Sequence, residues 1–302
     1  MAEKILNEWF LNSGVEIFLH HRLDSVIMEG NRIIKITMEN GTAFCAELFI
    51  DASYEGDLMA RAGISYEIGR ESRAKYGESY AGIKEIQPGE HQISVKISPY
   101  DNSGKLLPYV IDGSTIGAVG DSDNKVQAYC FRVCLTDIKE NQIPITRPDD
   151  YDPKRYELLK RFLTQRKALY KSIGMGGYNM DVREVQWIAK EVYWFPIPKR
   201  MVLMEGYFSH PVEPYEIPYR CLLPQQDECR NLLVTSCVSA SHMAYSSLRM
   251  EPQYIIMGHA AGVAAALVIK SKRPLHLIDI SELQGKLRKQ KQILSLEHIE
   301  TK

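Results

Sequence analysis

The stretch NLLVTSCVSASHMAYSSLRMEPQYIIMGHAAGVAAALVIK, residues 231–270, decides the order of elements in this part of the chain. It begins with the apolar run Leu232-Leu233-Val234, which predicts a short buried strand. A polar, serine-rich loop follows over residues 235–249, and Pro252 then suits the first turn of a helix, where its missing N–H group is not needed. The stretch therefore predicts a strand, a loop, and a helix whose N-terminus faces the loop. The free N–H groups of such an N-terminus suit an electron-rich ligand.

The predicted helix carries very little side chain over about two to three turns. Its small residues are Gly258, Ala260, Ala261, Gly262, Ala264, Ala265 and Ala266. Small residues let a helix backbone approach a sheet or a flat ligand closely, although glycine lowers helix propensity. A buried helix behind a sheet is one interpretation, and a ligand at its N-terminus is the other. We expect no membrane span, because His259 interrupts the apolar run and residues 254–269 fall short of the ~20 residues that a span needs.

The chain as a whole has the composition of a globular protein. Its 302 residues suffice for one large or two modest domains, with 45% apolar and 25% charged residues. The net charge of −1 does not indicate a basic surface that binds nucleic acid or an anionic membrane. Residues 1–12 lack the continuous apolar core of a signal peptide, so we expect a cytoplasmic protein.

No spacing of cysteines or histidines predicts a metal site. The six cysteines contain no CxxC pair, and the eight histidines contain no HExxH pattern. Cys130 and Cys134 are expected to share one face of a strand, as small core residues. Cys237, just beyond the strand at residues 232–234, is predicted to be a buried thiol rather than a covalent attachment point or a redox group.

The rest of the chain alternates helical and extended patterns, which indicate an α/β or α+β fold. Helices are predicted over residues 1–12, 58–62, 153–171 and 282–294, the last capped by Ser281. Strands are predicted over residues 15–19, 23–28, 32–38, 42–50, 93–97, 126–135 and 220–224. The turns Glu29-Gly30-Asn31 and Asn40-Gly41 separate the early strands, and residues 101–124 are expected to form a long surface loop.

Six strings follow one another along the chain: FIDASYEGDLMARAGISYEIGRESRAKYGESYAGI, KISPYDNSGKLLP, VQAYCFRVCLTD, YDPKRYELL, YNMD and CVSASHMAYSSLRMEPQYIIMGHAAGVAAA. In this order they resemble a family of FAD-dependent oxidoreductases of the glutathione-reductase-like flavoprotein superfamily. The resemblance runs from about residue 14 to residue 270. It implies a partial FAD/NAD(P)-binding-like domain at residues 1–83, an inserted β-rich, substrate-type domain at 84–224, and a return to the first domain at 225–302.

The glycine-rich turn that holds the pyrophosphate of FAD in such folds is not found. None of the twenty glycines forms a GxGxxG pattern, and Gly174-Met175-Gly176-Gly177 lacks the third glycine. The chain therefore resembles a member that is trimmed at its front and near residues 165–174. An alternative to catalysis follows: a truncated remnant that no longer binds FAD and associates with another chain or with a second copy.

The resemblance also implies which residues meet the cofactor. The turn Asp51-Ala52-Ser53 approaches it, and the adenine half passes near Arg22. The loop that contains Ser239, Ala240 and Ser241 lies against the flavin ring. The backbone N–H groups of Arg249, Met250 and Glu251 aim at the pyrimidine edge. The alternatives are that Asp51 caps a local turn and that the serines cap only a helix.

The implied activity is hydride transfer between a small organic substrate and FAD. His242 and Tyr245 are candidates for relaying the proton, and Arg249 for stabilising negative charge on the reduced ring. As alternatives, Tyr245 belongs to the core and Arg249 pairs with Glu251 or another acid.

Overall fold

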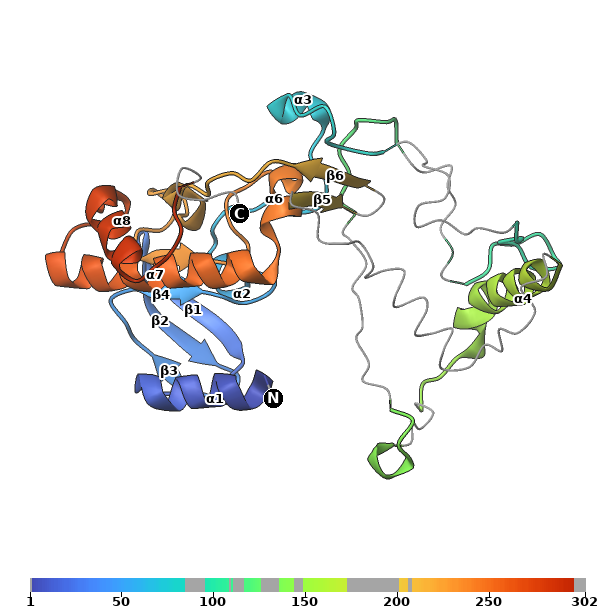
Figure 1. Ribbon diagram of the computed structural model, residues 1–302, viewed down its shortest axis with the longest axis horizontal. Helices are drawn as coiled ribbons and strands as arrows, with labels where there is room; N and C mark the ends of the chain where they lie inside the picture. Colours follow the sequence, from blue (N-terminus) through green and yellow to red (C-terminus); the bar gives the residue numbers. More distant parts are fainter. Residues whose placement is uncertain are drawn as a thin grey trace. The chain divides into compact units, whose positions relative to one another are not determined.

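The computed structural model describes residues 2–84, 96–108, 110, 117–125, 136–143, 149–172, 201–205 and 208–295. These residues form helices and small sheets, so the predicted mixed α/β class is confirmed (Figure 1). The chain divides into two compact units. The first comprises Met1–Glu67, Pro214–Ser241 and Leu248–Lys302, and the second comprises Ile68–Glu213 and His242–Ser247.

In the first unit, a helix precedes a small antiparallel sheet. Helix α1 (Ala2–Ser13) ends at Gly14, whose φ of 70° suits a residue without a β-carbon. Strands β1 (Leu23–Glu29) and β2 (Arg32–Met38) form the predicted hairpin, and β3 (Ala43–Phe44) returns beside β2.

A parallel pair of strands joins two distant parts of the sequence in this unit. Strand β4 (Phe49–Asp51) lies beside β7 (Leu232–Val234), with Phe49 opposite Leu232 and Asp51 opposite Val234. All three residues of β7 are buried, as the apolar run predicts. Because the strands are parallel, the turns that follow them lie at the same edge of the sheet. There, the backbone N–H of Thr235 donates to the carbonyl of Asp51 at 3.0 Å.

The core of the first unit lies between the hairpin, the parallel pair and helix α2 (Asp57–Arg61). Its buried members are Ile33, Phe49, Leu58, Met59, Ile64, Cys229, Leu232 and Val234. One buried polar side chain, that of Asn231, forms hydrogen bonds to several segments around this core. Its amide oxygen accepts the N–H of Ile33 at 2.9 Å, and its amide nitrogen donates to the carbonyls of Ile33 at 2.9 Å and Glu47 at 3.2 Å. Asn231 thus connects β2 to the start of β7 without a ladder of backbone bonds.

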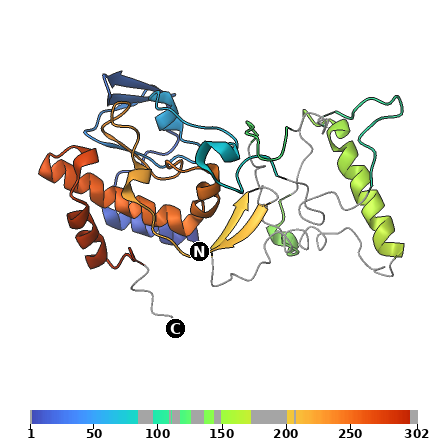
Figure 2. The ribbon, with the colours of Figure 1, turned by 90° about the horizontal axis from the view of Figure 1, so that it is seen from above.

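The C-terminal part of the first unit is helical. Helix α7 (Glu251–Ser271) buries Met257, Ala261, Ala264 and Leu267. The short 3-10 helix η5 (Leu275–Leu277) leads to helix α8 (Ile280–Lys289), which lies beside α7 in both views (Figure 1 and Figure 2). A β-carbon added at Gly258 or Gly262 would meet no atom within 4 Å, so these glycines do not serve the close packing expected of them.

Within the described part of the chain, α7 is the one helix long and apolar enough to cross a membrane. Helix α7 is 21 residues long because it includes polar residues on both sides of the apolar run at residues 254–269. Core helices of soluble proteins share this length and composition, so these two properties alone do not assign α7 to a membrane.

Several predicted elements differ from the structure. Residues 15–19 form no strand, because no strand among the described residues lies beside them to complete a ladder. Residues 220–224 fall in the 3-10 helix η4 (Tyr219–Leu222) instead of a strand. The cap of α8 is Asp279, whose carboxylate accepts the N–H of Glu282, and not Ser281.

In the second unit, the segment of residues 68–84 lies in close contact with the segment of residues 117–125. Arg70 and Asp123 exchange backbone hydrogen bonds of 2.8 and 3.1 Å, and a β-carbon at Gly69 would lie 2.1 Å from the carbonyl oxygen of Asp123. Glycine is therefore required at position 69 for this close approach.

The remaining elements of the second unit are short, apart from one helix. Helix α3 (Arg73–Tyr76) follows the first of the two segments, and α6 (His242–Leu248) contributes its first six residues to the unit. Strands β5 (Met201–Glu205) and β6 (Phe208–Val212) form an antiparallel hairpin. The 3-10 helices η2 (Lys139–Asn141) and η3 (Pro153–Tyr156) precede α4 (Glu157–Ser172), which matches the predicted long helix. The strand predicted at 126–135 lies outside the described residues, and so does most of the one at 93–97.

Candidate functional site

The residues predicted to form one site are divided between the two units. Those expected to meet the cofactor belong to the first unit: Arg22, Asp51, Ala52, Ser53, Ser239, Ala240, Ser241, Arg249, Met250 and Glu251. The two proton-relay candidates, His242 and Tyr245, belong to the second. We therefore describe the two groups separately.

In the first unit, Asp51 organises the turn after β4. It is 2% exposed, and its Oδ1 accepts the backbone N–H of Ser53 at 2.9 Å and the hydroxyl of Ser53 at 2.6 Å. Its Oδ2 accepts the backbone N–H of Met59 at 2.9 Å, inside helix α2. The hydroxyl of Ser53 also accepts the N–H of Asp57 at 2.8 Å. These bonds support the alternative interpretation, in which Asp51 caps the local turn.

The backbone of the same turn remains accessible. Ala52 is exposed and Ser53 is half-buried, and both side chains are small, whereas the next residue, Tyr54, has a large side chain that is 79% exposed. Small residues at the carboxyl end of a parallel strand are what a nucleotide cofactor requires for close contact.

The start of α7 is open as well. Met250 precedes the helix, is 46% exposed and makes no side-chain capping bond, and Glu251 and Pro252 are also exposed. The first N–H groups of α7 are thus uncapped by the side chain that stands before them. Arg249 is half-buried. This helix start can accept an electron-rich partner, as the sequence predicts.

The remaining residues of this group contribute less specific chemistry. Ser239 is exposed and its backbone N–H donates to the carbonyl of Cys221 at 2.8 Å, whereas Ala240 and Ser241 are half-buried. The side chain of Arg22 is 82% exposed and lies 3.5 Å from a carboxylate oxygen of Glu39. Ion pairs this exposed are weak, so Arg22 is easily diverted to an anionic ligand.

Cys237 lies beside the same turn. Burial, and then the nearby carboxylates of Asp51, Asp57 and Glu55, raise the pKa of the Cys237 thiol to about 11. The thiol is therefore protonated at neutral pH and is a poor nucleophile. Cys237 is half-buried, so the prediction of a buried thiol is met only in part.

In the second unit, part of the predicted serine-rich loop is helical. Residues 242–248 form α6, and two serines of the loop bond within it. The hydroxyl of Ser246 donates to the carbonyl of His242 at 2.8 Å, and that of Ser247 to the carbonyl of Ala244 at 2.9 Å. Both serines are buried, and Tyr245 is half-buried. These two hydroxyl groups therefore donate to carbonyls of their own helix.

His242, at the start of α6, is the most specifically held of the predicted catalytic residues. The ring is 9% exposed, and its Nδ1 forms a short hydrogen bond with Oε2 of Glu71. The same carboxylate oxygen accepts the backbone N–H of His242 at 3.0 Å. The other ring nitrogen, Nε2, is buried and has no hydrogen-bond partner among the described residues.

Glu71 is a residue that the sequence did not indicate. It lies in the string of residues 49–83 that carries part of the family resemblance, but nothing in that string singled it out, and 171 positions separate it from His242. Burial raises the pKa of Glu71, but the backbone and ring hydrogen bonds of His242 together lower it below its usual value of 4.5. The carboxylate is thus ionised at neutral pH. Only the tertiary fold shows this pair, since neither residue has a local signature.

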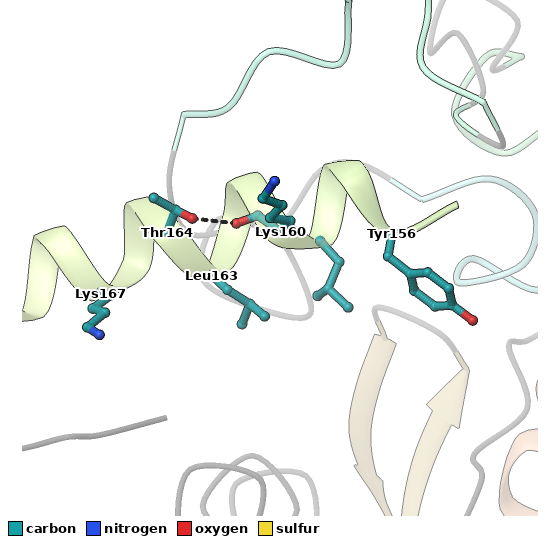
Figure 3. Close-up of a pocket in the computed structure, with 6 residues that line it drawn as sticks. Tyr156, Lys160, Leu163, Thr164 and Lys167 are labelled. Atoms are coloured by element: carbon teal, nitrogen blue, oxygen red, sulfur yellow. Dashed lines mark hydrogen bonds between the residues drawn. The ribbon is translucent and has the colours of Figure 1, made fainter. Parts of the chain in front are cut away.

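The grooves of the structure carry no comparable chemistry. One groove runs along α4 and is lined by Tyr156, Leu159, Lys160, Leu163, Thr164 and Lys167 (Figure 3). In it, the hydroxyl of Thr164 donates to the carbonyl of Lys160 at 2.8 Å, within the helix itself. A second groove of about 740 Å³ is lined by residues of α7, among them Gly258, Gly262 and Ala266, and by Lys286 of α8. Among the described residues, no group of three His, Cys, Asp or Glu side chains could hold a metal ion.

The residues of the first unit fit the ring side of a flavin better than they fit a diphosphate. An exposed small-residue turn and an uncapped helix start suit a flat, electron-rich heterocycle. A diphosphate needs a nest of backbone N–H groups on a glycine-rich turn, and the sequence contains no such pattern.

Comparison with known proteins adds one finding. A family described as FAD dependent oxidoreductase matches the chain over residues 1–172 and again over residues 162–287. No curated protein and no solved structure matches the chain.

Proposed function

Because this chain belongs to the FAD dependent oxidoreductase family, we propose that it transfers a hydride between a small organic substrate and FAD. FAD, when bound, supplies the hydride acceptor at its N5 atom. The residues described above would then hold the cofactor and handle the proton. The observation that carries the proposal is the buried Glu71–His242 pair, in which Nε2 of His242 has no partner among the described residues.

The first unit supplies groups for the cofactor. Ser239, Ala240 and Ser241 would line one side of the ring, and the N–H groups from Arg249 to Glu251 would face its pyrimidine edge. Ala52 would let the backbone approach the nucleotide. The guanidinium of Arg249 and the partial positive charge at the start of α7 would both favour electron density on the ring.

The second unit supplies the proton acceptor. When a hydride leaves a carbon that carries an O–H or N–H group, the proton of that group must also leave. Nε2 of His242 would accept it, directly or through one water molecule. Tyr245, three residues further along α6, is the second candidate for this step.

FAD binding is the first test. We expect the purified full-length chain to show flavin absorbance, or to quench the fluorescence of added FAD in a saturable way. A panel of small alcohols and amines, added without oxygen, should include a compound that bleaches the bound flavin. A colourless protein that leaves FAD fluorescence unchanged would contradict the proposal.

The variant His242→Asn sharpens this test. The asparagine amide places an N–H near the position of Nδ1 and can still donate to Glu71, but it has no equivalent of Nε2. We expect flavin bleaching by the active compound to slow by about 10²–10⁴-fold, the usual contribution of a general base. His259→Asn is the matched control, because His259 bonds to Gln290 at 2.6 Å on the surface.

A second candidate function is association without catalysis. Among the described residues, β4 pairs only with β7, and α1 exposes apolar side chains such as Trp9 at 66% and Leu11 at 81%. Exposed apolar patches are typical of surfaces that bind another protein. Light scattering after size exclusion decides between the two: a monodisperse monomer that binds FAD tightly excludes this candidate.

A further inference from the structure

The hydrogen bond between Glu71 and the ring of His242 has a defined donor and a defined acceptor. One carboxylate oxygen, Oε2, receives both the backbone N–H of His242 and its ring nitrogen Nδ1. An ionised carboxylate can only accept hydrogen bonds, so Nδ1 must carry the proton. In the neutral ring, Nε2 is then the bare nitrogen and can act as a base.

The segment that carries Glu71 is firmly held within the second unit. The neighbouring residue, Arg70, binds Asp123 with two guanidinium hydrogen bonds and also exchanges backbone bonds with it. The hydrogen bonds from Arg70, more than its charge, lower the pKa of Asp123. Two-pronged pairs of this kind fix geometry as well as charge. Glu71 is thus presented to His242 from a rigid support.

The unpartnered Nε2 completes the argument. Leaving a buried polar atom without a hydrogen bond costs about 1–3 kcal/mol, and few such atoms occur in natural proteins. His276 also has one ring nitrogen bonded, Nε2 to the carbonyl of Pro224 at 2.9 Å, and one buried without a partner among the described residues, so the contact with the Glu71 carboxylate is what sets His242 apart. In His242, the buried carboxylate of Glu71 holds Nδ1, and Nε2 has no hydrogen-bond partner among the described residues.

We infer that Glu71 is the positioning residue of the proton transfer, holding His242 in the tautomer whose Nε2 accepts a proton from the substrate. This inference rests on the proposed function. In the step, the substrate O–H or N–H bond would break as the Nε2–H bond forms, and bound FAD would supply the acceptor for the C–H electron pair. The carboxylate of Glu71 stabilises the resulting imidazolium, which later releases its proton to solvent.

The tautomer can be measured without turnover. In the full-length chain labelled with nitrogen-15 histidine, the two ring nitrogens of His242 give separate shifts, and His242→Asn identifies them by their disappearance. We expect Nδ1 to be protonated and Nε2 bare at a pH where the ring is neutral. In Glu71→Gln the side-chain amide can also donate, so a mixture of tautomers should appear. Glu157→Gln, which removes the carboxylate that lies 3.0 Å from Arg161 on α4 and does not touch the segment of Glu71, should keep the wild-type tautomer.

Turnover then separates a positioning role from a structural one. With the panel compound that bleaches the flavin, Glu71→Gln should lower kcat by about 10- to 100-fold with KM unchanged, part of what a general base contributes. Glu71→Asp should restore part of the loss. A wild-type ring with bare Nδ1, a tautomer that Glu71→Gln leaves unchanged, or an unaltered kcat at equal folded fraction would each overturn the inference. If FAD does not bind, the proposed function fails, and the redox role of the pair fails with it even where the tautomer is as expected.

Discussion

Two buried carboxylates, one in each unit, carry their hydrogen bonds in opposite ways. Asp51 is 2% exposed and Glu71 is 7% exposed. Both oxygens of Asp51 receive donors from the turn and helix that follow it, and none of these donors titrates. A single oxygen of Glu71 receives two donors from one distant histidine, and one of these donors is a titratable ring.

Burial alone therefore does not distinguish a structural carboxylate from one that we propose positions a histidine. The donors around Asp51 are backbone N–H groups and a hydroxyl, so its charge is used to close a turn. The charge of Glu71 is directed at a side chain that can gain and lose a proton, and this is how carboxylates orient histidine bases. The identity of the donor, and whether it retains an unused atom, distinguishes the two roles.

The largest expected effect tests whether the carboxylate of Asp51 has the structural role described above. Asp51→Ala removes the acceptor for three hydrogen bonds and leaves the N–H of Met59 buried without a partner. We expect a loss of about 4 kcal/mol in the local stability of the β4–β7 pair. Native-state hydrogen exchange at the amides of Met59 and Thr235 measures it. The tautomer of His242 should not change, and a change there would show that the two carboxylates are not independent.

The buried, uncharged side chain of Asn231 should give the second-largest effect. Asn231→Ala removes the side-chain bonds to the N–H and C=O of Ile33 and to the C=O of Glu47. We expect a loss of about 2–3 kcal/mol, read from exchange at the Ile33 amide. Asn31→Ala is the control, because its exposed side chain makes one bond, to the carbonyl of Gln226 at 2.9 Å. An equal loss from both variants would mean that burial of Asn231 adds nothing.

Only some parts of this fold can be predicted from the sequence. The β1–β2 hairpin, β7 and α7 follow from local signals: glycine turns, a short apolar run, and a proline at a helix start. The failures at residues 15–19 and 220–224 have one cause, because their apolar residues suit a strand but a strand exists only when another lies beside it. Such pairing is decided by distant parts of the chain.

The candidate site divides in the same way. The turn at Asp51 could be located because its residues are adjacent in sequence, and the cap interpretation was already one of its two alternatives. His242 was identified as a candidate, but what makes it specific was not. Glu71 lies in one of the strings that resemble the family but was not singled out there, and only the folded second unit brings its carboxylate to the ring.

The pH dependence of stability tests the catalytic half of the comparison. The pKa of Glu71 is lower in the folded chain than the value of 4.5 that applies when unfolded, so its ionised form stabilises the fold above about pH 4.5. That contribution disappears as the pH falls through the folded pKa. Glu71→Gln should cost about 2 kcal/mol at neutral pH, and the difference from wild type should shrink below pH 4.5. Exchange at the His242 amide over a pH series measures it. A difference that stays constant into acid would show that the charge of Glu71 is not used.

The smallest expected effect comes from a carboxylate six positions after Asp51. Asp57 begins α2, its side chain is 53% exposed, and it lies 3.3 Å from Arg61 one turn later. Solvent screens such a pair, and the favourable position at the helix start adds only a few tenths of a kcal/mol. We therefore expect Asp57→Asn to cost about 0.5 kcal/mol at the Met59 amide, far less than Asp51→Ala. If the two variants cost the same, the stability of this turn would come from negative charge near α2 in general, and the bonds drawn to the two oxygens of Asp51 would not explain it.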